Sequence, residues 1–207
     1  MADNRILLAK NTSLSGDNRN ILVVGTCASG KTYNYVYPNL LQCNGSCIVV
    51  DKGGYVQEMT EEVFRKKGYR IMTVNMEKDP TATISIEDIK TIGQTRTVLY
   101  IIPHLISSEV NASAIPYIIN NVFTKTAPDC PIPIHIFADE FACYGLGLKD
   151  FYKRLANRHP RISCSICIMS FDQLRWVVGD KWPLFVGACD AILFLSSPCD
   201  ANTMNIL

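Results

Sequence analysis

Short apolar runs recur along the whole chain and predict buried β-strands. The runs are rich in Ile, Val and Leu and show little alternation between apolar and polar positions. Unbroken apolar runs of this length are typical of strands covered on both faces, as in a parallel sheet. The expected strands cover residues 21–25, 46–51, 69–74, 97–102, 132–138, 162–169 and 190–195.

Helix-compatible segments lie between these strands. Pro38 falls inside the first of them, where it must kink the helix or stand near its end. Strands that alternate with helices require right-handed crossovers, so we expect an α/β fold with a mainly parallel, doubly wound sheet and helices on both faces. The expected helices cover residues 31–42, 55–67, 109–126, 148–158 and 181–188.

The composition limits the class of protein. With 207 residues, 48% of them hydrophobic and 19% charged, the chain is expected to form a single globular domain over residues 1–207. A net charge of +1 excludes a strongly basic or acidic protein, so a nucleic-acid surface would have to be local. No apolar run approaches the roughly 20 residues needed to span a bilayer, and residues 1–5 lack a signal-peptide pattern. We therefore expect this chain to be soluble and cytoplasmic.

Nine cysteines raise the alternatives of disulfides or a zinc site. Cys164 and Cys167 form a C-x-x-C pattern inside a predicted strand, where side chains three positions apart point to opposite faces. Such a pair cannot easily share a metal ion. Cys189 and Cys199 flank another apolar strand. We interpret the cysteines as reduced and mostly buried thiols.

The strongest chemical signal follows the first predicted strand. Residues 25–32 fit the pattern G-x-x-x-x-G-K-[ST] between a strand and a helix, which is the context of a phosphate-binding loop. Glycines let successive N–H groups surround phosphate, and the helix N-terminus adds positive charge. Lys31 would bind the β- and γ-phosphates, and the Thr32 hydroxyl would bind Mg²⁺. The predicted nucleotide contacts are Gly25, Thr26, Cys27, Ala28, Ser29, Gly30, Lys31 and Thr32.

Acidic residues end two other predicted strands. Asp139 and Glu140 follow the strand at 132–138, where the first acid would hold Mg²⁺ and the second would polarise the attacking water. Glu140 favours hydrolysis over phosphoryl transfer to a small acceptor. Asp51 ends the strand at 46–51 and could face the ligand crevice or merely end a turn.

These motifs together resemble the motor domain of type IV secretion coupling proteins, the conjugative DNA-transfer ATPases. The resemblance extends from about Arg5 to the C-terminus. Residues 20–32 and 38–41 are similar to the family's phosphate-loop region, and 50–54 to its D-P-K-G segment without the proline. Residues 139–145 match its D-E-F-A-x-x-G block, and 170–174 and 189–195 are similar to its Q-S-x-x-Q-L and N-C-D-x-x-x-F-L stretches.

The resemblance implies a RecA-like P-loop ATPase that binds ATP and Mg²⁺ and works as a hexameric ring. Such rings act at the cytoplasmic face of the bacterial inner membrane. They feed single-stranded DNA with its relaxase, or protein cargo, into the components of a secretion channel. By the same resemblance, Asp51 and Gln173 are carried over as nucleotide contacts.

The family's arginine finger acts in the neighbouring subunit and lies eleven residues before the first Gln of Q-S-x-x-Q-L. Met169 occupies that Gln position, and counting back without gaps gives Arg158 as the finger. Arg161 is the alternative. Either arginine could instead complement the carbonyl groups at a helix end.

The sequence departs from the family in three places. Met169 replaces the glutamine that senses the γ-phosphate, and a thioether makes at best a weak hydrogen bond. The all-α domain expected near residues 79–83 is absent or deleted, with Asp79-Pro80 as the splice point, and the membrane-spanning N-terminus has no counterpart. The sequence therefore predicts an ATP-hydrolysing transfer motor, with a nucleotide-binding assembly or recruitment module of weak turnover as the alternative.

Overall fold

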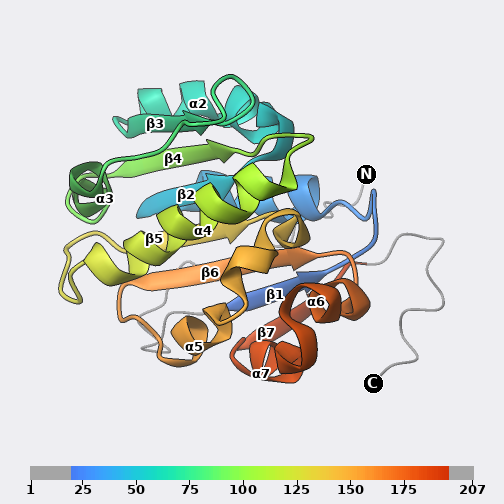
Figure 1. Cartoon of the computed structure of the whole chain (residues 1–207). Helices are drawn as coiled ribbons and strands as arrows, with labels where there is room; N and C mark the ends of the chain where they lie inside the picture. The colour runs from blue at the N-terminus through green and yellow to red at the C-terminus, as the bar shows by residue number, and fades with distance from the viewer. Residues whose placement is uncertain (1–19, 196–207) are drawn as a thin grey trace.

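Seven parallel strands form one sheet in the computed structural model, which describes residues 20–195 (Figure 1). The strand order across the sheet is β3-β4-β2-β5-β6-β1-β7, and every neighbouring pair is parallel. The strands are β1 (Ile21–Val24), β2 (Ser46–Val50), β3 (Arg70–Asn75), β4 (Thr97–Ile102), β5 (Ile134–Ala138), β6 (Ile162–Ile168) and β7 (Ala191–Phe194). The predicted parallel α/β fold is confirmed.

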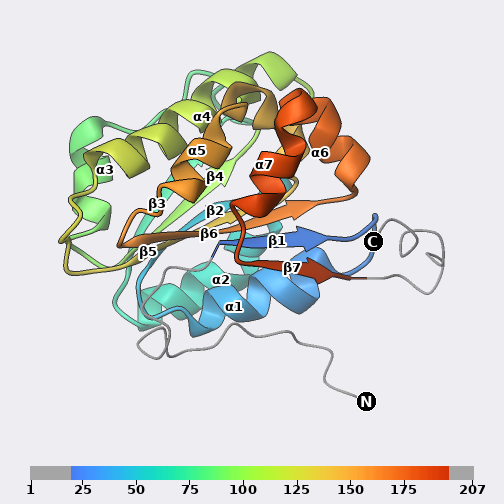
Figure 2. The same cartoon turned by 90° about the horizontal axis from the view of Figure 1, so that it is seen from below.

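Helices cover both faces of this sheet. Figure 2 shows α1 and α2 on one face and the remaining helices on the other. A π-helical turn, Lys31–Val36, leads directly into α1. The α-helices are α1 (Tyr37–Gln42), α2 (Tyr55–Lys66), α3 (Ile86–Ile92), α4 (Ser108–Lys125), α5 (Phe151–Ala156), α6 (Phe171–Val178) and α7 (Trp182–Gly187). Short 3₁₀ turns lie at Lys52–Gly54, Phe141–Cys143, Gly145–Leu148 and Gly179–Lys181.

The apolar strands divide their side chains between two cores, one on each face of the sheet. On β1, Leu22 and Val24 pack under α3–α7, and Val23 packs under α1 and α2. The alternation is hidden in the sequence because both faces are buried, so apolar residues occupy every position. Cys164 and Cys167 belong to opposite cores, as predicted, and their thiols are free. Cys199 and the segment 1–5 lie outside the described residues.

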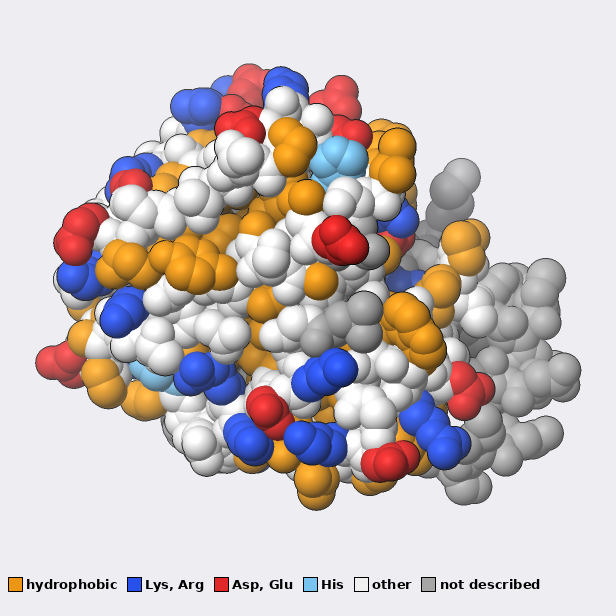
Figure 3. Space-filling view, viewed as in Figure 1, with side chains coloured by type: hydrophobic (Ala, Val, Ile, Leu, Met, Phe, Trp, Pro, Cys, Tyr) orange, Lys and Arg blue, Asp and Glu red, His pale blue; other side chains and the backbone are white. Residues whose placement is uncertain are grey.

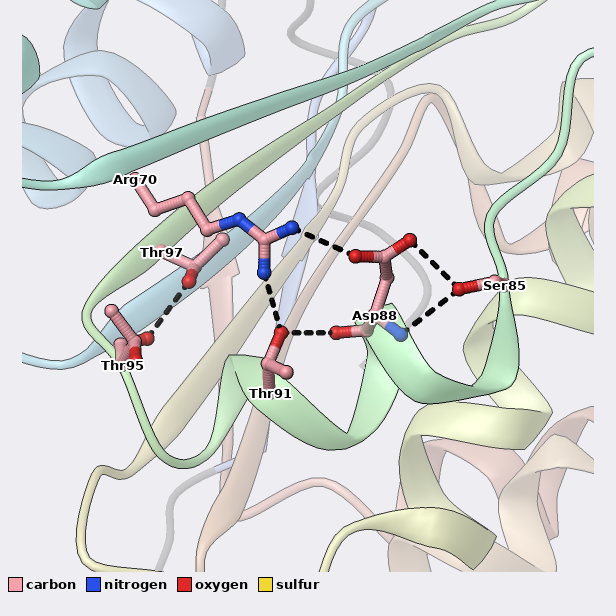
Figure 4. Close-up of polar contacts among 6 residues, drawn as sticks. All are labelled: Arg70, Ser85, Asp88, Thr91, Thr95 and Thr97. Carbon is pink, nitrogen blue, oxygen red and sulfur yellow. Dashed lines mark hydrogen bonds and ion pairs between the residues drawn. The ribbon is translucent and has the colours of Figure 1, made fainter.

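Helix α3 was not expected from the sequence, because seven residues are too few to show a helical pattern. Its start is fixed by Ser85, whose hydroxyl accepts the Asp88 N–H at 3.0 Å. Arg70 on β3 ion-pairs with the Asp88 carboxylate at 2.7 Å and donates to the Thr91 hydroxyl at 2.7 Å (Figure 4). Polar contacts therefore attach this short helix to the edge of the sheet.

Local features also explain one shifted strand start, the place of Pro38 and one more missed helix. Strand β5 begins at Ile134 rather than at 132, because Pro133 has no N–H to donate to a ladder. Pro38 lies in the first turn of α1, where the helix changes from π to α register. Helix α6 was missed as well, although Ser170 caps it by accepting the Gln173 N–H at 3.1 Å.

The crossover from β3 to β4 contains only residues 76–96, with α3 as its one helix. At the expected splice point, the Asp79 carboxylate accepts the N–H and the hydroxyl of Thr81 at 2.9 and 2.7 Å. A tight turn therefore lies at the predicted splice point. Among residues 20–195, no helix is both long and apolar enough to cross a bilayer.

Candidate functional site

Four neighbouring strands of the sheet carry the predicted site residues other than Arg158 at their carboxyl ends. In spatial order these strands are β2, β5, β6 and β1. Because all four are parallel, the segments that follow them meet at one edge of the sheet, where open α/β sheets bind ligands. This edge, called the carboxyl rim below, carries residues 51–52 after β2, 139–140 after β5, 169–173 after β6 and 25–32 after β1.

The loop after β1 has the backbone shape that a phosphate cradle needs. Ala28 and Gly30 adopt left-handed conformations, with φ values of 61° and 85°. A Cβ atom at Gly25 would lie 2.6 Å from the backbone oxygen of Leu195, so only glycine fits there. Ser29 Oγ is buried and has no hydrogen-bond partner within the described chain. A loop with an unpaired buried hydroxyl fits an anionic oxygen as its missing partner.

Lys31 points back into this loop. Its buried ammonium group donates to the backbone oxygen of Gly25 and, at 2.8 Å, to that of Thr26. Both acceptors are backbone carbonyls rather than carboxylates. The Lys31 charge is therefore not neutralised by an acidic partner inside the loop and remains suited to phosphate.

Thr32 and Asp139 are in direct contact at the centre of the rim. The Thr32 hydroxyl donates a 2.6 Å hydrogen bond to Asp139 Oδ2. Hydroxyl and carboxylate oxygens are hard donors of the kind that Mg²⁺ prefers. Within residues 20–195 no three His, Cys, Asp or Glu side chains cluster as metal ligands, so the remaining ligands of such an ion would come from phosphate and water.

Asp139 is 8% exposed. Burial raises the pKa of its carboxyl group, and the hydrogen bonds from the Thr32 hydroxyl and the Glu140 N–H partly offset that rise. The Tyr144 hydroxyl donates to the Asp139 backbone oxygen at 3.1 Å. The carboxylate is thus held in place by β5 and by the turn that follows it.

Glu140 differs from Asp139 in both exposure and partner. Its backbone is left-handed, with φ at 48°, and its side chain is 44% exposed. The carboxylate ion-pairs with the Lys52 ammonium at 2.8 Å. The Cys143 thiol also donates to Glu140 Oε2, at 3.5 Å. Neither contact was expected from the sequence, and the pair with Lys52 requires β2 and β5 to be neighbours, which the sequence does not reveal.

Asp51 lies at the rim but serves helix α2. Its buried carboxylate accepts the N–H groups of Val56 and Gln57 at 3.1 and 2.8 Å. Burial raises the Asp51 pKa, and these two N–H groups partly counter the effect. The structure therefore gives Asp51 a helix-capping role, and its contact with nucleotide stays a prediction.

Met169 and Gln173 lie between the phosphate loop and the acids, because β6 separates β1 from β5. Met169 is 43% exposed, and its N–H donates to the side-chain oxygen of Gln173 at 2.8 Å. Gln173 is thus folded back onto the end of β6. Its predicted contact with nucleotide is not shown by this geometry.

Arg158 and Arg161 lie just before β6 begins. They are therefore at the amino ends of the parallel strands, whereas Lys31 is at the carboxyl rim. The Arg158 guanidinium ion-pairs with Asp190, whose second oxygen accepts the Asn20 N–H at 2.7 Å. Arg161 donates to the backbone oxygens of Cys130 and Pro131 at 2.8 and 2.6 Å. Neither arginine can reach the site of its own chain, so a finger role would require a second copy.

A cleft of about 620 Å³ lies away from the carboxyl rim, between α4 and α5. Basic side chains gather over this part of the face in Figure 3. The predicted site residues are not among those that line it. Its lining residues are Asn120, Gly147, Leu148, Lys149, Asp150, Phe151, Lys153, Arg154 and Asn157.

Comparisons with known proteins place the chain among coupling-protein folds. Residues 4–83 match the family described as Type IV secretory system Conjugative DNA transfer. The plasmid coupling protein TrwB in complex with the ATP analogue ADPNP superposes with a TM-score of 0.69 at 12% identity, covering 98% of this chain and 77% of that chain. The chain resembles the conjugative coupling proteins in sequence and in fold.

Two further solved structures have a similar fold. TrwB in complex with ADP and Mg²⁺ gives a TM-score of 0.68 at 11% identity, covering 98% of this chain and 76% of that chain. The genome packaging NTPase B204 of Sulfolobus turreted icosahedral virus 2, in complex with ATP-gammaS, gives a TM-score of 0.50 at 16% identity, covering 86% of this chain and 74% of that chain. No curated protein matches the chain. The resemblance to coupling proteins and the RecA-like P-loop fold are thereby confirmed.

Proposed function

We propose that this chain is the ATP-hydrolysing motor domain of a type IV secretion coupling protein. The observation that carries the proposal is the contact between Thr32 and Asp139, which joins the phosphate loop to the acid pair at one rim. Solved coupling-protein relatives bind ADPNP, or ADP with Mg²⁺. The nucleotide of this chain is then ATP, seated on residues 25–32.

Each rim residue has a definite task in hydrolysis. Lys31 exchanges its two carbonyl acceptors for phosphate oxygens and compensates their charge. Thr32 and Asp139 hold Mg²⁺, which neutralises phosphate charge when bound. Glu140 orients the attacking water and accepts its proton as the water oxygen bonds to the γ-phosphorus, while the bond from that phosphorus to the bridging oxygen breaks and ADP leaves.

Assembly and cargo follow from the family resemblance. The motor acts as a homo-hexameric ring at the cytoplasmic face of the bacterial inner membrane and moves single-stranded DNA with its relaxase, or protein substrates, into a secretion channel. The location of Arg158, at the edge opposite Lys31, supports a finger that works on the neighbouring copy. Arg161 has the same location and is the alternative.

The second candidate is a nucleotide-binding assembly or recruitment module that turns over weakly. Met169 favours this alternative, because its side chain stands at the rim between the phosphate loop and the acids. A thioether there would not report the γ-phosphate by a strong hydrogen bond. The two candidates share the nucleotide site and differ in turnover.

A concentration series of the ATPase rate, with and without single-stranded DNA, tests the motor. We expect the rate per subunit to rise with protein concentration, because Arg158 acts between copies. We also expect it to rise with single-stranded DNA, which is the proposed cargo. Lys31→Ala should abolish binding, and Glu140→Gln should preserve binding while lowering kcat by about 100-fold or more. Tight ATP binding without turnover at any concentration would instead support the recruitment module.

A further inference from the structure

We propose that Lys52 is a positioning residue that restrains Glu140 and so limits the rate of hydrolysis. The inference rests on the proposed function, because it assigns Glu140 the role of general base. The observation behind it is separate from those that support the proposed function. Lys52 Nζ lies 2.8 Å from Glu140 Oε2, and the two residues follow the neighbouring strands β2 and β5. No other cation of the described chain ion-pairs with Glu140.

The pair occupies an atom that the proposed task of Glu140 needs. Lys52 holds Glu140 Oε2, and a carboxylate oxygen held by an ammonium group is not available to orient a water molecule for attack. The hydrogen bond with Glu140 also raises the pKa of Lys52, so Lys52 stays charged while it is paired. Glu140 must therefore leave Lys52 before this oxygen can orient the attacking water.

The backbone at Lys52 is held in place, while the charged end of its side chain is exposed. The preceding residue, Asp51, is buried and tied to the first N–H groups of α2. The side chains of Lys52 and Glu140 are 46% and 44% exposed. Exposed ion pairs contribute little to stability, so this pair can open and close without disturbing the rim.

Cys143 provides a reporter that does not depend on activity. Its thiol donates to the same Glu140 oxygen at 3.5 Å. Burial raises the Cys143 pKa first, the Glu140 charge raises it further, and Lys52 lowers it. Because the thiolate is the reactive form, removal of Lys52 should slow alkylation of Cys143, and Glu140→Gln should speed it.

The test compares ATPase kinetics of the full chain and its Lys52→Met variant. We expect kcat to rise about two- to five-fold with KM unchanged, the scale set by one exposed ion pair. Lys52→Arg keeps the charge and should return kcat to the wild-type value. Lys90→Met is the matched control, since it breaks the Lys90–Glu87 pair of equal length, 2.8 Å, on α3.

The results separate the two proposals. If the wild type hydrolyses ATP and Lys52→Met has an equal or lower kcat, the proposed restraint by Lys52 is wrong, but the proposed ATP-hydrolysing function is not affected. If Cys143 alkylation is unchanged in Lys52→Met, the pair does not form in solution and the restraint is again wrong. If no variant hydrolyses ATP, Lys52→Met included, the proposed function itself fails.

Discussion

The hydroxyl of Thr32 donates a 2.6 Å hydrogen bond to the carboxylate of Asp139, 107 residues later in the chain. This contact joins the helix that follows the phosphate loop to the end of β5, although β6 lies between their strands. The contact thereby brings two oxygen donors together directly after the phosphate loop. Four predictions follow from this arrangement and from the elements around it.

Loss of the Thr32 hydroxyl should weaken ATP binding only when Mg²⁺ is present. Thr32→Val removes one ligand and leaves Asp139 without its hydroxyl partner. We expect the affinity for Mg²⁺-ATP to fall by at least about tenfold, the scale of a hydrogen bond to a charged group. Titration calorimetry with and without EDTA measures the difference, and Thr32→Ser should behave as wild type. An equal loss in EDTA would exclude a metal role for Thr32.

As the pH is lowered, Mg²⁺-nucleotide should be released at a higher pH than if Asp139 were an exposed carboxylate. Asp139 binds Mg²⁺ only when deprotonated, and burial raises its pKa above the usual value of 3.8. As pH falls, Asp139 therefore takes up a proton sooner than an exposed Asp, and affinity should decline from a correspondingly higher pH. Binding measured in EDTA is the control and should lack this decline. A decline confined to the usual range near 3.8 would contradict the assignment.

His135 should make the protein sensitive to mild acid. Its two ring nitrogens contact the hydroxyls of Ser163 and Ser165 at 2.7 and 2.8 Å, and burial lowers its pKa from 6.5 to about 4. The unfolded chain then binds a proton first, so stability is present above pH 6.5 and is lost as pH falls to about 4. The full loss is about 3 kcal/mol.

Urea denaturation between pH 7 and pH 4 checks this prediction. His135→Gln, which has no proton to gain, should flatten the pH dependence of the free energy of unfolding even if its stability at pH 7 is lower. His159→Gln is the control for the loss of one histidine, because it leaves His135 and its two serine partners in place. A wild-type slope in His135→Gln would show that other groups cause the acid sensitivity.

Arg158 should act on a neighbouring copy. Arg158→Ala removes the proposed finger and also breaks the ion pair with Asp190, whereas Asp190→Asn breaks the same pair and leaves the guanidinium available. We expect Arg158→Ala to lower kcat by about 1000-fold, the range of an arginine finger, and Asp190→Asn to leave it nearly unchanged. Equal losses in the two variants would instead assign Arg158 a structural role.

A mixing experiment adds a second check on Arg158. Subunits carrying Arg158→Ala keep Glu140, and subunits carrying Glu140→Gln keep Arg158. In mixed assemblies the intact finger of one copy can serve the intact site of the other. Recovery of ATPase activity on mixing is expected, and its absence would contradict action between copies.

The sequence predicted the sheet better than the arrangement of the site. Runs such as 46–51 identify buried strands because covered strands need apolar residues on both faces, but they do not encode strand order. The contact between Thr32 and Asp139 could be expected from motif chemistry. The pair of Lys52 and Glu140 could not, because it depends on β2 lying beside β5.

Short polar contacts explain the remaining differences. Helix α3 buries Ile89 and Ile92, but polar contacts of Ser85 and Arg70 fix its start and attach it to β3. Asp51 was predicted to face the ligand crevice or to end a turn; it lies at the carboxyl rim, and its carboxylate accepts N–H groups at the start of α2. Contacts between single polar groups leave no periodic signal in the sequence.

A crystal structure of the chain with Mg²⁺ and a non-hydrolysable ATP analogue tests the central claim most directly. We expect the triphosphate on residues 25–32, the Lys31 ammonium on the β- and γ-phosphates, and Mg²⁺ bound by the Thr32 hydroxyl with Asp139 in the same coordination sphere or one water away. Nucleotide density at the cleft between α4 and α5, or Mg²⁺ remote from Thr32 and Asp139, would contradict the account.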